Sequence, residues 1–236
     1  MTTVETDRLI LRPWAEGDLG PLAAIFAEPA FWRYPFGRGF TRVETEQFLE
    51  RQFEHWATHG FGSWAAELKD GHRLIGYIGL AVPTWLPQVM PAVEVGWRLH
   101  PDHWGRGLAT EGGRASVRHG FDELGLDRII AIVQPKNVAS RRVIAKLGMV
   151  AVSTTRDAAR EVDLEVHEIS GATWAVRNAH DWFEVNSGWA PPEEDELAEW
   201  LADGVCKSPD DCFVSPDGWC RHGLASWALI LRALDD

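Results

Sequence analysis

The stretch HWGRGLATEGG, residues 103–113, places a glycine on each side of an arginine and then continues with small residues. It follows the strand-like run AVEVGWRL at residues 92–99 and leads into a helical pattern from Thr110 to Leu124. Glycine has no Cβ and a helix N-terminus leaves its first amides unpaired, so an anion such as a diphosphate can approach this turn closely. An ordinary strand-to-helix turn that needs glycine for its backbone angles has the same pattern, and the stretch alone leaves both interpretations open.

The regions around this stretch alternate between strand and helix patterns. Thr41 and Glu44 have capping-box spacing at the start of a helix that Gly60 closes. Further elements are predicted as strands at residues 8–13, 92–99 and 128–133, a hairpin at 63–82, helices at 18–28, 110–124 and 137–148, and a last strand within 162–176. The order indicates an α/β fold class, with a mixed sheet flanked by helices.

The composition separates two zones. The chain has 236 residues and a net charge of -12, and 13 of its 35 acidic residues but only 4 of its 23 basic residues lie in residues 177–236. Nucleic-acid binding depends on clustered Lys and Arg, so the acidic tail argues against it. No apolar run approaches the ~20 residues of a membrane span, and the first residues carry no secretion signal. We expect a cytoplasmic protein that binds neither membrane nor nucleic acid.

A second motif, VQPKNVASRRVIAKLGM at residues 133–149, places Asn137 and Ser140 between a buried strand and a helix. Together with TDRLILRP, GSWAAELKDGHRLIGYIGL and VEVGWRLHPDHWGRGLATE, it resembles the GNAT superfamily of acetyl-CoA-dependent N-acetyltransferases. Within that superfamily the chain is similar to the branch of ribosomal-protein N-terminal acetyltransferases (RimJ/RimL-like). The resemblance covers roughly residues 4–176 and implies a mostly antiparallel sheet whose fourth and fifth strands splay apart.

The resemblance also implies an acetyl-CoA site. The glycine turn and the helix after it would cradle the coenzyme A diphosphate, and the fourth strand would pair with the pantetheine arm. Asn137 and Ser140 match polar contacts to the pantetheine and thioester region. By position the other residues are Gly105, Arg106, Gly107, Leu108, Ala109 and Thr110 for the cradle, and Trp97, Arg98 and Leu99 for the strand. Trp104 stands where many relatives have Gln or Arg, but a cradle of backbone amides does not depend on that side chain.

Glu94 is the candidate general base, acting through water, because it lies on the fourth strand next to the expected splay. A strand glutamate that faces solvent or forms a salt bridge is the alternative, and Glu67 is a second candidate base. Ile144 stands at the position of the family's helix tyrosine, and the resemblance to the ribosomal-protein branch implies Ser140 as the general acid instead. A reaction without a dedicated acid is also open, because the coenzyme A thiolate is a fair leaving group. A hydroxyl that only caps the start of the helix is the alternative for Ser140.

The sequence leaves the acceptor open. The expected reaction moves an acetyl group directly to a primary amine, which is either a protein N-terminus or a small-molecule amine such as an aminoglycoside. The aromatic loop FWRYPFGRGF, residues 31–40, either walls the acceptor pocket or packs on itself. The alternative function is a non-catalytic acyl-CoA-binding or scaffold protein that uses its C-terminal module for protein interaction. Oligomeric state is also left open.

The tail predicts a separate small module. We expect a GNAT domain at residues 1–176, a linker at 177–190 and an acidic C-terminal module at 191–236 with helices at 191–204 and after residue 222. Between these helices lie three cysteines and a histidine: Cys206, Cys212, Cys220 and His222. This set suits one structural zinc ion. Free thiols beside a surface histidine, or one disulfide and a spare thiol, are the alternatives.

Overall fold

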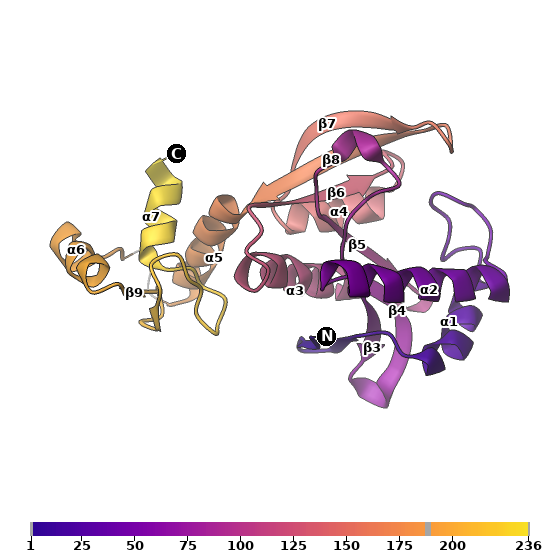
Figure 1. Cartoon of the computed structure of the whole chain (residues 1–236), viewed down its shortest axis with the longest axis horizontal. Coiled ribbons are helices and arrows are strands. Elements are labelled where there is room, and N and C mark those ends of the chain that lie inside the picture. Colours follow the sequence, from indigo (N-terminus) through magenta and orange to yellow (C-terminus); the bar gives the residue numbers. More distant parts are fainter. Residues whose placement is uncertain (1, 187–189, 236) are drawn as a thin grey trace. The chain divides into compact units, whose positions relative to one another are not determined.

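The computed structural model describes residues 2–186 and 190–235 (Figure 1). The chain forms two compact units. Unit 1 comprises the residues up to Val117 together with Ile129–Glu168, and unit 2 comprises Arg118–Arg128 together with the residues from Ile169 onward. The chain therefore passes from one unit to the other within a helix, and returns at the start of a strand.

Unit 1 is built on an eight-stranded sheet in the order β1-β2-β3-β4-β5-β6-β8-β7. Its strands are β1 (Val4–Glu5), β2 (Leu9–Arg12), β3 (Ser63–Leu68), β4 (Arg73–Ala81), β5 (Glu94–Leu99), β6 (Arg128–Val133), β7 (Val150–Asp157) and β8 (Val162–Ser170). The pairs from β1 to β5 and the pair β7–β8 are antiparallel, whereas β5 and β6 are parallel. The predicted α/β class with a mixed, mostly antiparallel sheet is confirmed.

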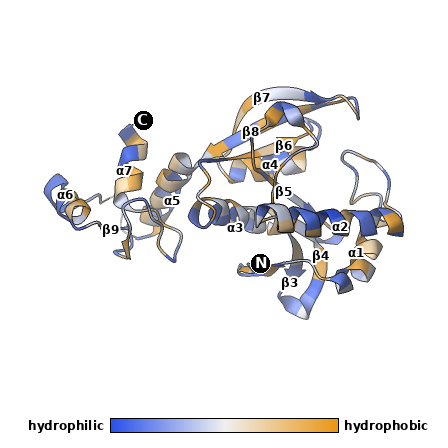
Figure 2. Ribbon diagram, in the orientation of Figure 1, coloured by the Kyte–Doolittle hydropathy of each residue, from blue (hydrophilic) through white to orange (hydrophobic). Residues whose placement is uncertain are grey.

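The helices of this region are α1 (Leu19–Phe26), α2 (Arg42–His59), α3 (Leu108–Asp122) and α4 (Val138–Lys146). The predicted limits of α2 are confirmed. The Thr41 hydroxyl accepts from the Glu44 amide, the Glu44 carboxylate accepts from the Thr41 amide, and Gly60 ends the helix at φ 75°. In Figure 2 the helices carry both hydrophobic and hydrophilic residues, as expected for helices that bury one face.

The core of unit 1 combines aliphatic strand residues with aromatic side chains. Trp64 on β3 and Phe26 on α1 are fully buried, and Phe26 forms edge-to-face contacts with Trp32 and Phe48. The tryptophan-rich composition therefore fills the space between the sheet and the first two helices. This packing fixes the strands whose ends carry the candidate site.

Unit 2 contains α5 (Gly171–Asn186), α6 (Glu194–Ala202), the short hairpin β9 (Cys206–Lys207) and β10 (Phe213–Val214), and α7 (Trp227–Asp235). Phe183, Trp227 and Ile230 are buried in its core. The structure differs from the predicted division of the chain, because α5 runs through the expected boundary at 176 and through the expected linker as far as Asn186. The remaining linker residues 187–189 lie outside the described residues. In the described part of the chain, no helix combines the length and apolar character needed to cross a bilayer.

Candidate active site

A cleft opens where β5 and β6 part. The register between these parallel strands contains one pair, Glu94 with Ile130, in the described part of the chain. Beyond this pair a cavity of about 960 Å³ lies between them. Its walls come from β5, the turn after it, the first turn of α3, the end of β6 and the start of α4. The splay of the fourth and fifth long strands thus creates a space that is open to a ligand.

The glycine turn forms one end of the cleft. Gly105 and Gly107 have φ of 72° and 81°, a left-handed conformation that favours glycine, and α3 begins at Leu108. Five of the six predicted cradle residues line the cavity: Gly105, Gly107, Leu108, Ala109 and Thr110. Arg106 is not among the lining residues, and its carbonyl accepts a 2.9 Å hydrogen bond from Arg8 Nη1. The cradle is therefore a backbone feature, with Arg106 on its outer side.

Trp97, Arg98 and Leu99 of β5 also line the cleft, as predicted for the strand that faces the pantetheine. The Arg98 side chain is held elsewhere. Its Nη1 donates to the Phe31 carbonyl at 3.0 Å, and its guanidinium lies 4.6 Å from the centre of a Trp32 ring. Arg98 therefore fixes the aromatic loop to β5 and leaves its backbone to face the cleft.

Trp104 has a definite role in this turn. Its indole Nε1 donates a 2.7 Å hydrogen bond to the Leu99 carbonyl, at the end of β5. The side chain thus ties the end of the strand to the start of the glycine turn, although nearly half of it is exposed.

Glu94 lies at the point where the two strands separate, and it lines the cavity. Burial of the carboxyl group raises the pKa of Glu94 to about 7, because it disfavours the charged form. Hydrogen bonds from the Ile132 amide and the Trp85 side chain, together with the charge of Arg98, act in the opposite direction. A carboxylate that titrates near neutrality is suited to accept a proton and release it again.

Glu67, the second candidate base, is not in the cleft. Its carboxylate accepts from Arg12 Nε at 2.7 Å and lies 2.8 Å from His72 Nδ1. Burial tends to raise its pKa, but these hydrogen bonds and charges prevail and lower the pKa of Glu67. The structure gives this residue an ion-pairing role on β3.

Asn137 and Ser140 meet at the start of α4, where both line the cavity. Asn137 is the N-cap of this helix, and its Oδ1 accepts a 3.2 Å hydrogen bond from the Ser140 amide. The capping bond thus uses the Asn137 side chain and the Ser140 backbone. Ile144 is buried on the same helix and also lines the cavity, at the position where the resemblance implied a tyrosine.

The aromatic loop between α1 and α2 has both functions that its sequence left open. Phe31, Trp32, Tyr34 and Phe36 all line the cavity, but Phe31 and Trp32 are buried in the core, whereas Phe36 is 40% exposed. The Tyr34 hydroxyl donates to the Lys136 carbonyl at 3.1 Å. The first part of the loop therefore anchors it, and the second part borders the cleft.

The family model described as Acetyltransferase (GNAT) domain matches residues 8–150. This range contains β5, β6, the glycine turn and α4. The chain belongs to the GNAT acetyltransferases. It is 34% identical over 146 residues to the uncharacterized N-acetyltransferase YoaA of Bacillus subtilis, which covers 61% of this chain and 81% of that protein. It is 37% identical over 124 residues to the FsC-acetyl coenzyme A-N(2)-transacetylase of Aspergillus fumigatus, covering 50% of this chain and 52% of that protein.

The fold is also similar to that of solved GNAT enzymes. The crystal structure of the ribosomal-protein-S5-alanine acetyltransferase from Vibrio fischeri superposes with a TM-score of 0.60 at 22% identity, covering 74% of this chain and 99% of that chain. At this identity the likeness concerns the fold. The protein is therefore an N-acetyltransferase of the GNAT family, whose acetyl donor is acetyl-CoA.

The cleft of this GNAT domain fits the donor. A Cβ added at Gly105 meets no heavy atom within 4 Å, so the space above this backbone is free. The first amides of α3 have no partner inside the helix and carry the positive end of its dipole. These groups would hold the diphosphate, and the parted edge of β5 would hold the pantetheine arm.

Two residues that contact the glycine turn or Glu94 were not predicted from the sequence. Arg8 donates through Nε to Glu111 Oε2 at 2.6 Å and through Nη1 to the Arg106 carbonyl, so it joins the start of β2 to the glycine turn. Trp85, in the loop between β4 and β5, provides the hydrogen bond to Glu94. Arg8 and its partners are about a hundred residues apart in the chain, and no local pattern links them.

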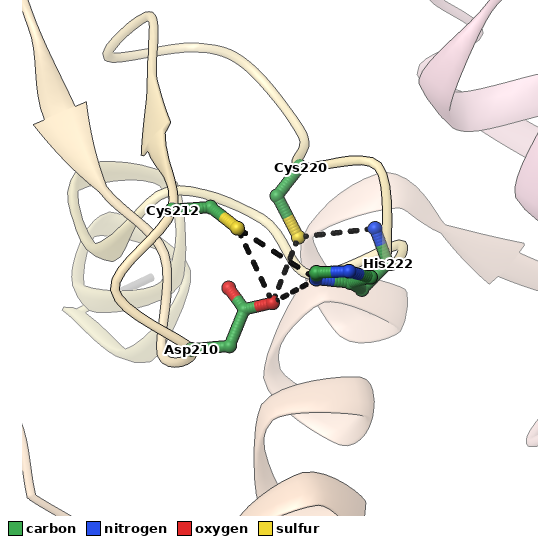
Figure 3. Close-up of side chains that lie close together, drawn as sticks. All are labelled: Asp210, Cys212, Cys220 and His222. Atoms are coloured by element: carbon green, nitrogen blue, oxygen red, sulfur yellow. Dashed lines mark hydrogen bonds and ion pairs between the residues drawn. The ribbon is translucent and has the colours of Figure 1, made fainter.

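The C-terminal Cys/His cluster differs from the predicted set. Asp210, Cys212, Cys220 and His222 place one ligand atom each within 4.8 Å of one another (Figure 3). Cys206 is not a member of this group. It is fully buried in the core of unit 2, and its thiol donates to the neighbouring Lys207 carbonyl at 3.5 Å. The fourth member is a carboxylate, which the sequence analysis had counted only as part of the acidic tail.

Proposed function

We propose that this protein moves the acetyl group of acetyl-CoA directly to a primary amine bound in the cleft. The observation that carries the proposal is the position of Glu94. It lies where β5 and β6 part, in the same cavity as the glycine turn and α4, and its pKa is raised to about 7. A base with such a pKa, next to an acyl-donor site, suits deprotonation of an amine at neutral pH.

In this proposal Glu94 accepts the proton of the incoming ammonium group through a water molecule. Bound acetyl-CoA supplies a thioester carbonyl that a neutral amine can attack. The hydrogen bond from Trp85 keeps a fraction of Glu94 charged at neutral pH, and the low exposure of the site keeps that carboxylate basic. Burial is needed because a fully exposed glutamate, with a pKa near ~4.3, is a weak base. The hydrogen bond is needed because only the charged carboxylate can accept the proton.

Ser140 is the proposed proton donor to the departing thiolate. The helix cap is provided by Asn137, so the Ser140 hydroxyl is not used for that bond. Tyr34 and Tyr77 are the two tyrosines of the chain. The Tyr34 hydroxyl is bonded to a backbone carbonyl and the Tyr77 hydroxyl accepts from Arg98 Nε at 3.2 Å, which makes them poorer candidates.

The acceptor is either a protein N-terminus or a small-molecule amine such as an aminoglycoside. Tyr34 and Phe36 border the cavity on the side of the aromatic loop and provide apolar surface beside the acceptor.

The test compares amines that differ in basicity. A lysine-type amine titrates near ~10.4 and an α-amine near ~7.7–8.0, so the first needs more help from a base. With coenzyme A thiol release as the assay, Glu94→Gln should lower kcat/KM for lysine-type amines by ~100-fold or more, and less for α-amines. The control is Glu50→Gln, an exposed glutamate of α2 outside the cleft.

Equal and small losses for both amine classes would remove Glu94 from the reaction. A second outcome would favour a non-catalytic acyl-CoA-binding protein. In that case calorimetry detects binding of coenzyme A, but no peptide, lysine-type amine or aminoglycoside that is tested causes thiol release.

Ser140→Ala tests the proton donor in the same assay. We expect kcat to fall more in this variant than in Tyr34→Phe or Tyr77→Phe. Ser140 is the residue that the resemblance places at the thioester region, and the alanine variant loses its hydroxyl. A larger loss in either tyrosine variant would move the assignment to that tyrosine.

A further inference from the structure

The four side chains of the C-terminal cluster come from two segments that fold back on one another. Asp210 and Cys212 belong to the loop that joins β9 to β10, which is closed by hydrogen bonds between Ser208 and the Asp211 and Cys212 backbone. Cys220 and His222 lie in a tight turn before α7, where the Cys220 amide donates to the Leu224 carbonyl at 2.8 Å. Figure 3 shows the side chains of both segments pointing toward a common centre.

Three of the distances between ligand atoms match the edges of a tetrahedral zinc site. Cys212 Sγ lies 3.6 Å from His222 Nδ1 and 3.5 Å from Asp210 Oδ2, and Cys220 Sγ also lies 3.5 Å from Asp210 Oδ2. With Zn–S bonds of about 2.3 Å and Zn–N or Zn–O bonds of about 2.0–2.1 Å, a tetrahedron separates sulfur from nitrogen or oxygen by about 3.5 Å. The two sulfurs therefore lie at the spacing that a central ion needs, whereas His222 Nδ1 and Asp210 Oδ2 are closer than such an edge and would separate when an ion binds between them.

The contacts of one oxygen argue for a cation rather than a hydrogen-bond network. Both thiols and His222 Nδ1 converge on Asp210 Oδ2, and the histidine contact is the shortest. A carboxylate oxygen has about two lone pairs, and Cys212 Sγ also faces His222 Nδ1, so the protons of these groups compete for the same acceptors. A metal ion at the centre resolves the conflict, because each group then directs a lone pair at the ion instead of a proton at Asp210.

The groups around the cluster would orient these ligands. The Ser208 hydroxyl donates to Asp210 Oδ1 at 2.6 Å, which leaves Oδ2 to face the centre. The His222 amide donates to Cys220 Sγ at 3.4 Å, a contact that stabilises a thiolate. Outer hydrogen bonds of this kind hold metal ligands in position. Coordination through Nδ1 leaves the ring proton of His222 on Nε2, so the exposed Arg221 side chain, now bonded there, must turn away.

We propose that Asp210, Cys212, Cys220 and His222 bind one zinc ion that joins the β9–β10 loop to the turn before α7. The two thiols each release a proton on binding, so two thiolates, one carboxylate and a neutral imidazole surround Zn²⁺. Four protein ligands leave no open position, which makes the site structural. The segment between α6 and α7 contains two strands of two residues each, so a metal contributes order where regular structure is scarce.

The first experiment measures metal in protein purified without a polyhistidine tag. We expect about one zinc per chain, and an Asp210→Asn variant should bind zinc at least ~10-fold more weakly. Asp211→Asn is the matched control, because Asp211 is the next residue and asparagine tolerates its φ of 59°. Cys206→Ala should retain the zinc, since Cys206 lies in the hydrophobic core away from the cluster.

A second measurement does not depend on variants that fold poorly. Cobalt added to reduced, chelator-treated wild type should produce thiolate-to-metal absorption bands, which zinc then removes. Metal-free protein with three titratable thiols, a Cys212–Cys220 disulfide in freshly purified protein, or zinc that survives Asp210→Asn but is lost in Cys206→Ala would each overturn the proposed site. None of these results bears on acetyl transfer by the cleft.

Discussion

Trp85 and Glu94 show how single side chains set the chemistry of the cleft. Burial disfavours the charged carboxylate, whereas the Ile132 amide, the Trp85 indole and the charge of Arg98 stabilise it, so the pKa near 7 is a balance of these effects on one group. Tryptophan also contributes apolar surface, and the ring of Trp85 lies 5.6 Å from the Arg160 guanidinium. A change that removes the N–H but keeps an aromatic ring at this position should therefore alter the balance.

Trp85→Phe is expected to raise the pKa of Glu94, because the charged form loses a hydrogen bond. If Glu94 acts when deprotonated, the acidic limb of the kcat/KM profile moves to higher pH. The control is Trp104→Phe, which removes an indole of similar exposure (47% against 45%) that donates to Leu99 instead. A limb that stays in place in Trp85→Phe, or moves equally in both variants, would contradict this role.

The sequence indicated the backbone residues of the site better than its side-chain partners. Glu94, Asn137 and the two glycines line the cavity, and the sequence could indicate them because each lies at an end of a strand or the start of a helix, positions that follow from hydrophobic periodicity. Cys206 was assigned wrongly, because composition gathers cysteines without showing which of them face the core. Asp210 was missed for the same reason, since a ligand aspartate looks like any other acid of the tail.

In our proposal, donor binding depends on the segment formed by β5, the glycine turn and the start of α3. Gly107 has φ of 81°, and a Cβ added there lies 3.5 Å from Arg8 Nη2. A side chain at this position would project where the turn meets the Arg8 contact and would shift the amides of the cradle. This segment is therefore expected to be sensitive to changes of its backbone at the glycines.

Gly107→Val is expected to weaken coenzyme A binding, measured by calorimetry, by ~10-fold or more, since a β-branched residue at positive φ is strained by ~1–3 kcal/mol. Gly60→Val carries a comparable strain at φ 75° at the end of α2, away from the cleft. It should leave affinity unchanged. Equal affinity in a folded Gly107→Val protein would remove the glycine turn from the binding site.

Elements with strong periodicity were predicted well, and those that depend on pairing were not. The predicted strand at 128–133 is β6 itself. β7 was missed because most of its residues are exposed and its sequence, VAVSTTRD, has little apolar character; it forms by pairing with β8. The expected linker was inferred from a change in composition, whereas Trp174, Ala175, Ala179 and Phe183 bury one face of a continuous α5.

The raised pKa of Glu94 should make the free energy of unfolding of the protein depend on pH. A glutamate pKa raised from 4.5 to about 7 means that the folded state binds more protons than the unfolded state between these pH values. The free energy of unfolding therefore falls as pH rises through this window and stays lower above it. Catalytic position and stability oppose each other at Glu94.

Glu94→Gln should consequently be more stable than wild type at pH 8, by at most ~3 kcal/mol, and close to it at pH 4. Urea unfolding at both pH values checks this without any substrate. The exposed-residue control, Glu50→Gln, should show no such pH dependence. The same stability difference at pH 4 and pH 8 would indicate that Glu94 has an ordinary pKa.

At the scale of the chain, the order of elements was predictable and the division into units was not. Unit 2 takes Arg118–Arg128 from the middle of the sequence as well as the residues from Ile169 onward. Composition and periodicity indicate boundaries between segments that are neighbours in the sequence. They do not indicate a unit that combines the end of α3 with helices about fifty residues further on.

The parting of β5 from β6 has a further consequence for how the protein meets other chains. It creates an edge in the interior of a sheet: β5 pairs with β4 along its whole length, but on its other side the described residues pair with β6 only at Glu94. Exposed edges invite pairing with strands of other molecules, and proteins generally cover or blunt them. Here the edge is recessed in a cavity of about 960 Å³ between β5 and β6. A slender, amide-bearing chain can enter this slot, whereas a β-strand flanked by its own sheet cannot, so the same recess that admits the donor guards the protein against aggregation.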